Sequence, residues 1–440
     1  MWLSVAISLS LTSIISTNVS ADNISLEQVT TDVSFLASDN LAGRAAFSEG
    51  IDKAANYISK RFSGIGLSPL KGLNGFKQTF EISQIVPNSI NLTLNGNNIS
   101  ENNITMASTI ESIVWTNTEQ FKTVVISPKD DMRQVLGELN QRGGKYLVLL
   151  NKVHAKVFSR YQSYFQKGLT KLDLTHRGAI IIVLSDETSI DSVDLKATSV
   201  INKQFLSNVI GVLPGKSRPE EIVLYSAHYD HLGVKSTKND DDRDLIYNGA
   251  DDDASGTTAV INLAEYFAKK SDNARTLIFS AFTAEEMGGF GSRYLSRKLK
   301  PDNITAMINI EMIGKPSKFG RGTLWMTGML RSDLGALLNA GLKDQKLEIY
   351  QDPYPEQGLF YRSDNATLAR LGVPAHSFSS TQLDKDQHYH QVSDEVKSLD
   401  LRSLQQVIET ISIATEGLVK GHDTPTRLDT SKVKGKGKIF

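Results

Sequence analysis

The fold is decided by residues 222–231, IVLYSAHYDH, where an apolar run passes directly into two imidazoles and a carboxylate. Further apolar runs follow at 276–282 (TLIFSAF), 306–310 (AMINI) and 373–378 (VPAHSF). A helical pattern occupies 258–269, and an amphipathic pattern at Leu401, Leu404, Ile408 and Ile411 predicts a closing helix. Continuous apolar strands that alternate with helices are typical of a sheet covered on both faces. The sequence therefore predicts an α/β fold with a central sheet between two helical layers.

The remaining chain divides by composition. Residues 25–65 have helical periodicity, whereas 85–205 are rich in Asn, Ser and Thr and contain short β-like runs. We predict five segments: an export signal at 1–21, an N-terminal part of the main domain at 22–84, an inserted β-rich domain at 85–205, the main domain at 206–422, and a disordered Lys/Gly tail at 423–440.

Composition excludes several classes of function. The 440 residues carry a formal net charge of -1, which argues against nucleic acid as a partner. There is no cysteine, so any metal must bind to His, Asp or Glu. The uncharged apolar segment before Val19-Ser20-Ala21 indicates export, to the periplasm or the medium, and no other run is long enough for stable membrane insertion.

Side chains suited to metal binding follow the predicted strands. The clusters are His228 with Asp230, the run Asp251-Asp252-Asp253, Glu285-Glu286, Glu311, and His388 with His390. Because ligands gather at the carboxyl ends of parallel strands, we expect these clusters to converge. Each cluster alone is an ordinary strand end, helix cap or acidic loop, but together they indicate a metal centre.

These clusters resemble the co-catalytic di-zinc aminopeptidases, a family that includes glutamate carboxypeptidase-like enzymes. The motif Gly-Ala-Asp-Asp-Asp-Ala-Ser-Gly at 249–256, with Glu-Glu following, carries most of the resemblance, and the segment 36–44 is similar to the same family. The resemblance implies a three-layer zinc exopeptidase-like fold with a mixed central sheet. It also implies peptide substrates and two Zn²⁺ per chain, and it makes residues 85–205 similar to a protease-associated domain.

The same resemblance implies a role for each residue of the site. Asp251 would bridge the two metals, and Glu285 would act as general base on the attacking water. The other implied metal ligands are His228, Glu286, Glu311 and His390. Asp230 would orient His228, and Tyr361 is a candidate oxyanion or substrate contact.

The sequence departs from the family pattern at two positions. Glu311 stands where Asp is common, and Ser363-Asp364-Asn365 stands where Ser-Asp-His is usual. The alternatives are a carboxypeptidase or glutaminyl cyclase on the same fold, or a peptidase-like binding protein without activity. Calcium binding by Asp240, Asp241 and Asp242 is a further, weaker hypothesis.

Overall fold

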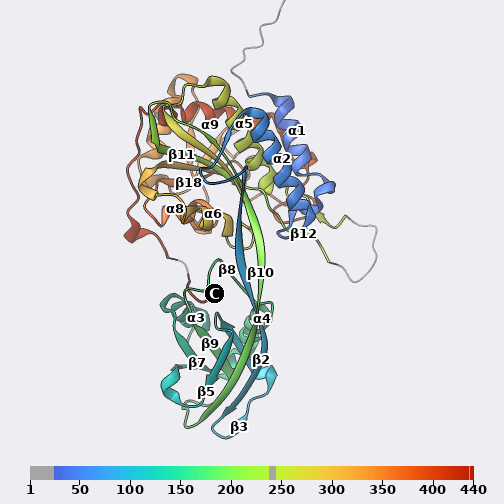
Figure 1. Ribbon diagram of the computed structural model, residues 1–440, viewed down its shortest axis with the longest axis vertical. Coiled ribbons are helices and arrows are strands. Elements are labelled where there is room, and N and C mark those ends of the chain that lie inside the picture. The colour runs from blue at the N-terminus through green and yellow to red at the C-terminus, as the bar shows by residue number, and fades with distance from the viewer. Residues whose placement is uncertain (1–23, 237–243, 436) are drawn as a thin grey trace, which may run out of the picture.

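The computed structural model describes residues 24–236, 244–435 and 437–440. Figure 1 shows a larger α/β body joined to a smaller one by two long antiparallel strands, β2 (Lys77–Leu94) and β10 (Val193–Leu213). The predicted export signal and the Asp240–Asp242 cluster lie outside the described residues. Within the described residues, no helix combines the length and the apolar character needed to cross a membrane.

The larger body is built on a mixed sheet. Four parallel strands form its centre in the order β18 (Ala375–Ser379), β15 (Ile304–Ile310), β11 (Arg218–His228) and β14 (Arg275–Phe282). Antiparallel β10 and β2 extend the sheet beyond β14, while β16 (Leu324–Met326) and β17 (Ile349–Gln351) extend it beyond β18. The predicted strands at 222–227, 276–282 and 306–310 are therefore confirmed.

Helices cover both faces of this sheet, as the fold prediction required. One face carries the helices α1 (Leu26–Leu36), α2 (Glu49–Ile65), α5 (Gly256–Lys270), α7 (Leu334–Leu342) and α9 (Leu401–Ala414). The opposite face carries α6 (Phe290–Ser296) and α8 (Asn365–Ala369). Both helical layers bury apolar side chains against the sheet, which makes the three-layer arrangement stable.

The smaller body has its own sheet, in the order β4 (Ile104–Ser108), β9 (Ala179–Leu184), β7 (Lys145–Leu150) and β6 (Lys122–Ile126). The helices α3 (Met132–Arg142) and α4 (Ala155–Gln166) pack on one face, and the β2/β10 ribbon with β5 (Ser112–Trp115) packs on the other. Parallel pairing of β6, β7 and β9 makes this an α/β unit rather than a purely β-rich one. The predicted boundaries at 85 and 205 fall inside β2 and β10.

The C-terminal segment differs from the predicted disordered tail. The backbone N–H of Leu428 donates to the carbonyl of Gly372 at 3.0 Å, so the segment begins on the larger body. It ends on the smaller body, where Asn140 accepts from the backbone N–H groups of Ile439 and Phe440 at 2.7 and 2.8 Å. Ile439 is buried, and the ring of Phe440 lies edge-on to Phe165. Composition missed this segment because a few apolar contacts anchor it among many Lys and Gly residues.

Candidate metal centre

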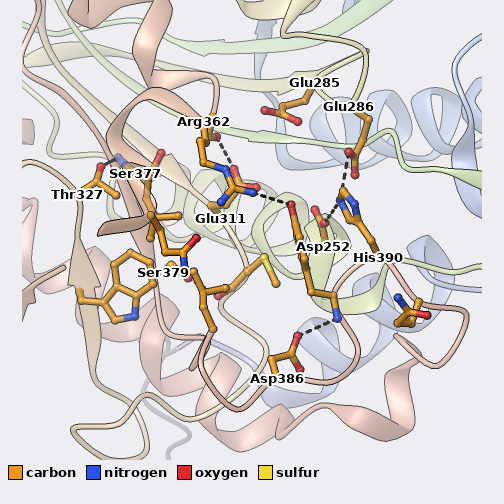
Figure 2. Close-up of a pocket in the computed structure, with 18 of the residues that line it drawn as sticks. Asp252, Glu285, Glu286, Glu311, Thr327, Arg362, Ser377, Ser379, Asp386 and His390 are labelled. Atoms are coloured by element: carbon orange, nitrogen blue, oxygen red, sulfur yellow. Dashed lines mark hydrogen bonds and ion pairs between the residues drawn. The ribbon is translucent and has the colours of Figure 1, made fainter. Parts of the chain in front are cut away.

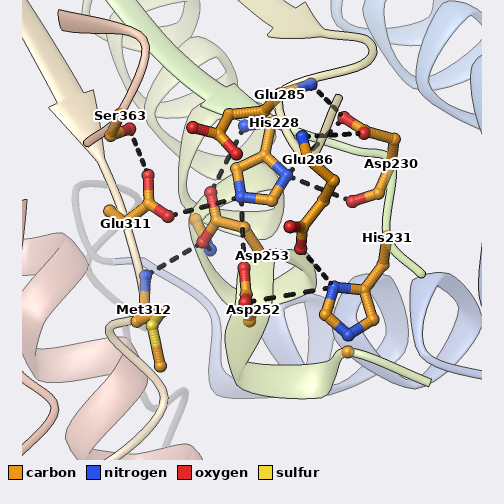
Figure 3. Close-up of polar contacts among 12 residues, drawn as sticks. His228, Asp230, His231, Asp252, Asp253, Glu285, Glu286, Glu311, Met312 and Ser363 are labelled. Atoms are coloured by element: carbon orange, nitrogen blue, oxygen red, sulfur yellow. Dashed lines mark hydrogen bonds and ion pairs between the residues drawn. The ribbon is translucent and has the colours of Figure 1, made fainter. Parts of the chain in front are cut away.

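Most of the predicted site residues converge at the carboxyl ends of the central strands, as Figure 3 shows for His228, Glu285 and Glu311. His228 ends β11, Glu285 follows β14, and Glu311 follows β15. Asp252 lies in a tight turn, Ala250–Ser255, that leads into α5. His390 comes from the loop between β18 and α9. Residues far apart in the sequence are thus brought to one edge of the sheet, where parallel strands place their ligands.

Glycines allow the turn around Asp252 to approach its neighbours closely. Gly249 has a φ of 54°, and a Cβ at this position would lie 2.2 Å from the carbonyl oxygen of Asp252 and 2.5 Å from the His231 ring. At Gly256 a Cβ would lie 2.5 Å from the Asp253 carboxylate. Any larger side chain at either position would therefore displace the acidic turn.

Asp252 lies between two groups of potential ligands. Its Oδ1 is 3.2 Å from Nε2 of His228, which is also 3.3 Å from Oε1 of Glu311. Its Oδ2 is 3.2 Å from Nε2 of His390, which is also 3.3 Å from Oε2 of Glu286. Each carboxylate oxygen of Asp252 thus faces a separate group of one imidazole and one glutamate.

The contacts of His390 are typical of ligands that share a cation. Two carboxylate oxygens lie within 3.3 Å of its Nε2, yet this buried nitrogen has no hydrogen bond of acceptable geometry. A second imidazole, His231, borders the same group: its Nδ1 is 2.9 Å from Oε1 of Glu286, and its buried Nε2 has no partner among the described residues. The sequence analysis did not select His231, although its three-residue spacing from His228 was visible.

Asp251, the predicted bridging residue, points elsewhere. Its Oδ1 accepts from the backbone N–H of Gly314 at 2.7 Å, and its Oδ2 accepts from Thr381 at 2.6 Å and lies 3.3 Å from Nζ of Lys315. These buried partners direct the carboxylate away from His228 and His390. The structure therefore corrects the expected position by one residue, to Asp252.

Asp230 contacts His228, but not in the way that was predicted. Nδ1 of His228 lies 3.1 Å from the backbone carbonyl of Asp230 and 3.7 Å from its carboxylate. The carboxylate instead accepts from the backbone N–H groups of Glu285 and Glu286 at 3.0 and 3.3 Å. Asp230 therefore orients the His228 ring with its main chain and the Glu285-Glu286 turn with its side chain.

The structure places Tyr389, to which the sequence analysis gave no role, closer to the site than the hydroxyl of Tyr361. The Tyr361 hydroxyl accepts from Arg331 at 3.1 Å and donates to the carbonyl of Lys432 at 3.4 Å, so it faces the C-terminal segment. Tyr389, next to His390 in sequence, stacks on that imidazole at 4.0 Å between ring centroids. Burial and the charges of Asp252 and Glu286 raise the pKa of Tyr389. Its hydroxyl therefore remains a hydrogen-bond donor, a role that the sequence analysis had given to Tyr361.

The two departures from the family pattern are accommodated locally. Glu311 accepts a short hydrogen bond from Ser363, which fixes its longer side chain beside His228. Asn365 donates to the carbonyls of Phe360 and Ala375 at 3.1 and 3.3 Å, and it accepts from Ser377. Asn365 thus has a structural role behind the site.

The site carries an excess of buried negative charge. Burial, with the charges of Glu311, Asp364 and Glu286, raises the pKa of Glu285 well above its usual value. The nearby carboxylates of Asp252 and Glu286 raise the pKa of His390 to about 10. Carboxylates this close repel one another unless cations balance them. The donors are all oxygen or imidazole nitrogen, a set that suits zinc and several other divalent ions.

Two cavities meet at this centre. The first has a volume of about 490 Å³ and includes Asp252, Glu311, His390, Met312 and Trp325 in its lining (Figure 2). The second, of about 300 Å³, extends toward α6 and α8. Their shared wall is formed by Glu285, Glu286, Arg362, Ser363 and Tyr389. Glu285 is thus accessible from both sides, as a group that acts on a bound substrate must be.

The family match coincides with the part of the chain that forms this centre. Residues 208–415 match the model of peptidase family M28. The matched segment contains all the converging His, Asp and Glu side chains described above.

Curated relatives are similar over part of the chain. A probable zinc metalloprotease of Leptosphaeria maculans is 33% identical over 111 residues, which is 25% of this chain and 25% of that protein. Leucine aminopeptidase 1 of Ajellomyces dermatitidis is 29% identical over 220 residues, which is 48% of this chain and 55% of that protein. The chain thus spans about a quarter of the length of the zinc metalloproteases that it matches.

Solved structures share the fold of this chain over most of its length. An aminopeptidase from Aneurinibacillus sp. strain AM-1 has a TM-score of 0.53 at 18% identity, covering 94% of this chain and 97% of that one. A zinc aminopeptidase from Bacillus subtilis has a TM-score of 0.54 at 16% identity, covering 94% and 100%. At these identities the likeness supports the fold, including the three-layer body predicted from sequence.

Proposed function

We propose that this chain is an exported aminopeptidase that holds two zinc ions and removes N-terminal residues from peptides. One observation carries the proposal: each oxygen of Asp252 faces its own group of an imidazole and a glutamate. His228 and Glu311 would complete one zinc site, and His390 and Glu286 would complete the other. Asp252 would be the shared ligand.

Glu285 is the proposed general base. Zinc at these positions would supply Lewis acidity and lower the pKa of a water molecule toward about 7. Glu285 would accept the proton of the attacking water on a carboxylate oxygen and return it to the nitrogen of the departing amine. Asp230 holds the backbone of Glu285 in place, and burial raises the pKa of this carboxyl, which helps it to retain the proton between the two transfers.

Tyr389 is the proposed donor to the carbonyl oxygen of the cleaved bond. It lines both cavities and stands next to a proposed ligand, so its hydroxyl can reach a substrate that spans the shared wall. A hydrogen bond that strengthens as negative charge develops on this oxygen stabilises the transition state. Arg362 donates to the Tyr389 hydroxyl at 3.4 Å and helps to orient it.

The distribution of charge supports an exopeptidase. The acidic side chains of Asp252, Glu311 and Asp386 border only the first cavity, so a positively charged substrate amine is attracted to that side. Met312, Trp325 and Leu383 give the same cavity an apolar wall, which suits an uncharged N-terminal side chain. Export is proposed from the uncharged apolar segment that precedes Val19-Ser20-Ala21.

The test combines metal analysis with a substrate panel. The purified protein should contain about two equivalents of zinc, lose activity on chelation and regain it with zinc. It should release N-terminal residues from peptides with free amines and leave N-acetylated versions of the same peptides intact. Hydrolysis of acetylated peptides from the C-terminus, or cyclisation of N-terminal glutamine without hydrolysis, would refute the proposal.

A further inference from the structure

Unpaired cations surround the second cavity. Arg362 belongs to the wall shared by both cavities, and its side chain makes one hydrogen bond, to Tyr389, with no ion pair among the described residues. Arg370 lines the second cavity beside α8. Its Nε donates to the carbonyl of Lys434 at 2.9 Å, and its Nη1 donates to the carbonyl of Ala366 at 3.1 Å. Its Nη2 has no partner in the part of the chain that the structure describes.

The positive charge continues toward the smaller body. Burial, together with Arg297 and Arg370 nearby, lowers the pKa of Arg293 on α6. Burial, with Arg293 nearby, lowers the pKa of Lys171 to about 8. Asp173, a carboxylate near these cations, forms an ion pair with Arg297 and so is already neutralised. Figure 1 shows that α6 and α8 lie on the side of the larger body that faces β8 (Leu169–Lys171) and the smaller body.

The two cavities therefore differ in the charged groups that each has to itself. Asp252, Glu311 and Asp386 border the first cavity alone, whereas Arg370 borders the second alone; Glu285, Glu286 and Arg362 border both. Arg370 is partly buried without a counter-charge, whereas Arg362 is exposed. A partly buried cation without a counter-charge is costly, and an anion bound at Arg370 would remove that cost. A guanidinium with a free Nη2 can bind a carboxylate through a charge-assisted hydrogen bond.

We propose that the second cavity receives the leaving-group side of the substrate and that Arg370 and Arg362 bind a carboxylate there. The preferred substrates would then be peptides that carry negative charge directly after the cleaved bond. This inference rests on the proposed aminopeptidase function. The carboxylate comes either from the C-terminus of a dipeptide or from an acidic side chain.

Two pairs of substrates separate these sources. Leu-Asp-amide and Leu-Asn-amide differ only in the charge of the side chain, while Leu-Ala and Leu-Ala-amide differ only in the charge of the C-terminus. For the full-length zinc enzyme at low ionic strength, we expect kcat/KM to favour the acidic member of at least one pair by about tenfold. The pair that shows the preference identifies the source, and added salt should reduce it.

Substitutions of the two arginines test whether the preference for acidic substrates arises in the second cavity. Arg370→Gln and Arg362→Gln should bring the acid-to-amide ratio of kcat/KM toward one, whereas Arg370→Lys should retain part of it. Arg133→Gln is the matched control, because Arg133 is exposed on α3 and borders neither cavity; it should keep the wild-type ratio.

Two results would overturn the inference. Equal kcat/KM for acidic and amide substrates in the wild type is one, and an unchanged ratio in a folded Arg370→Gln variant is the other. If no peptide with a free N-terminus were hydrolysed, the proposed function would fail together with this inference. Hydrolysis without any charge preference would refute the inference alone.

Discussion

Replacing each of two adjacent aspartates by asparagine gives the sharpest test of the metal centre. Asp252→Asn removes a charge that lies 3.2 Å from both His228 and His390. Asp251→Asn removes a charge that is equally buried but is directed to Lys315 and Thr381. The two substitutions are chemically identical and one residue apart, so they separate a shared ligand from a supporting residue.

The expected magnitudes differ. A unit charge about 4 Å from another contributes about 4 kcal/mol at an effective dielectric constant of 20, so Asp252→Asn should weaken binding of each ion by about a thousandfold. Asp251 acts through its neighbours, and the loss of such outer contacts typically costs about 10–100-fold in metal affinity. Asp251→Asn should also lower the free energy of unfolding by about 1–3 kcal/mol, because Lys315 loses one of its partners.

The assay is zinc content after dialysis against a graded series of chelator concentrations, with urea unfolding of the metal-free variants alongside. We expect Asp252→Asn to fall below one equivalent of zinc under conditions in which Asp251→Asn retains two. The reverse order of zinc content, with Asp251→Asn the poorer binder, would show that the correction from Asp251 to Asp252 is mistaken.

Four further predictions follow from the geometry. Glu285→Gln should retain zinc but lose about 10²–10⁴-fold in kcat, and near-normal turnover would exclude it as general base. Tyr389→Phe should lower kcat by about 10²–10³-fold with little change in zinc content; a change confined to KM would contradict the assigned hydrogen bond. Lys315→Met should lower the free energy of unfolding by about 3–5 kcal/mol in urea titrations, since it leaves buried carboxylates unpaired, and an unchanged midpoint would refute this. Burial raises the pKa values of Asp364 and Asp394 to about 7 in the folded protein. As the pH falls, these two carboxyls are therefore protonated in the folded state at a higher pH than in the unfolded state. The metal-free protein should therefore lose stability as the pH rises from about 4 through 7, and a thermal midpoint that increases from pH 5.5 to pH 8 would contradict this.

The N-terminal residues contribute to the same centre from a distance. Arg44 is buried and donates to the carbonyls of Tyr229 and Gly249 at 2.8 and 2.9 Å. It thus ties the loop after His228 to the turn that carries Asp252. Arg44 therefore gives a structural role to residues 36–44, the segment that the sequence analysis found similar to the family.

The sequence by itself determined the types of ligand and the layer architecture. Runs such as 222–227 and 276–282 are mostly apolar, because strands buried on both faces admit few polar side chains. The absence of cysteine restricted the donors to imidazole and carboxylate. His228, Glu285, Glu286 and Glu311 were selected at or beyond the ends of expected strands, and His390 was selected in the loop before the last helix. The structure brings all five together.

Only the tertiary structure decided which of three adjacent aspartates faces the two ligand groups. The direction of each carboxylate is set by partners distant in sequence. Asp251 is held by Gly314, Lys315 and Thr381, whereas Asp252 lies against His228 and His390. The position of Tyr389 beside His390 and the anchoring of the C-terminal segment could likewise not be predicted from the sequence, because their contacts come from chain segments that meet only in the folded protein. Local periodicity records which side chains are buried, but the direction in which a turn presents its charges depends on the packing of everything around it.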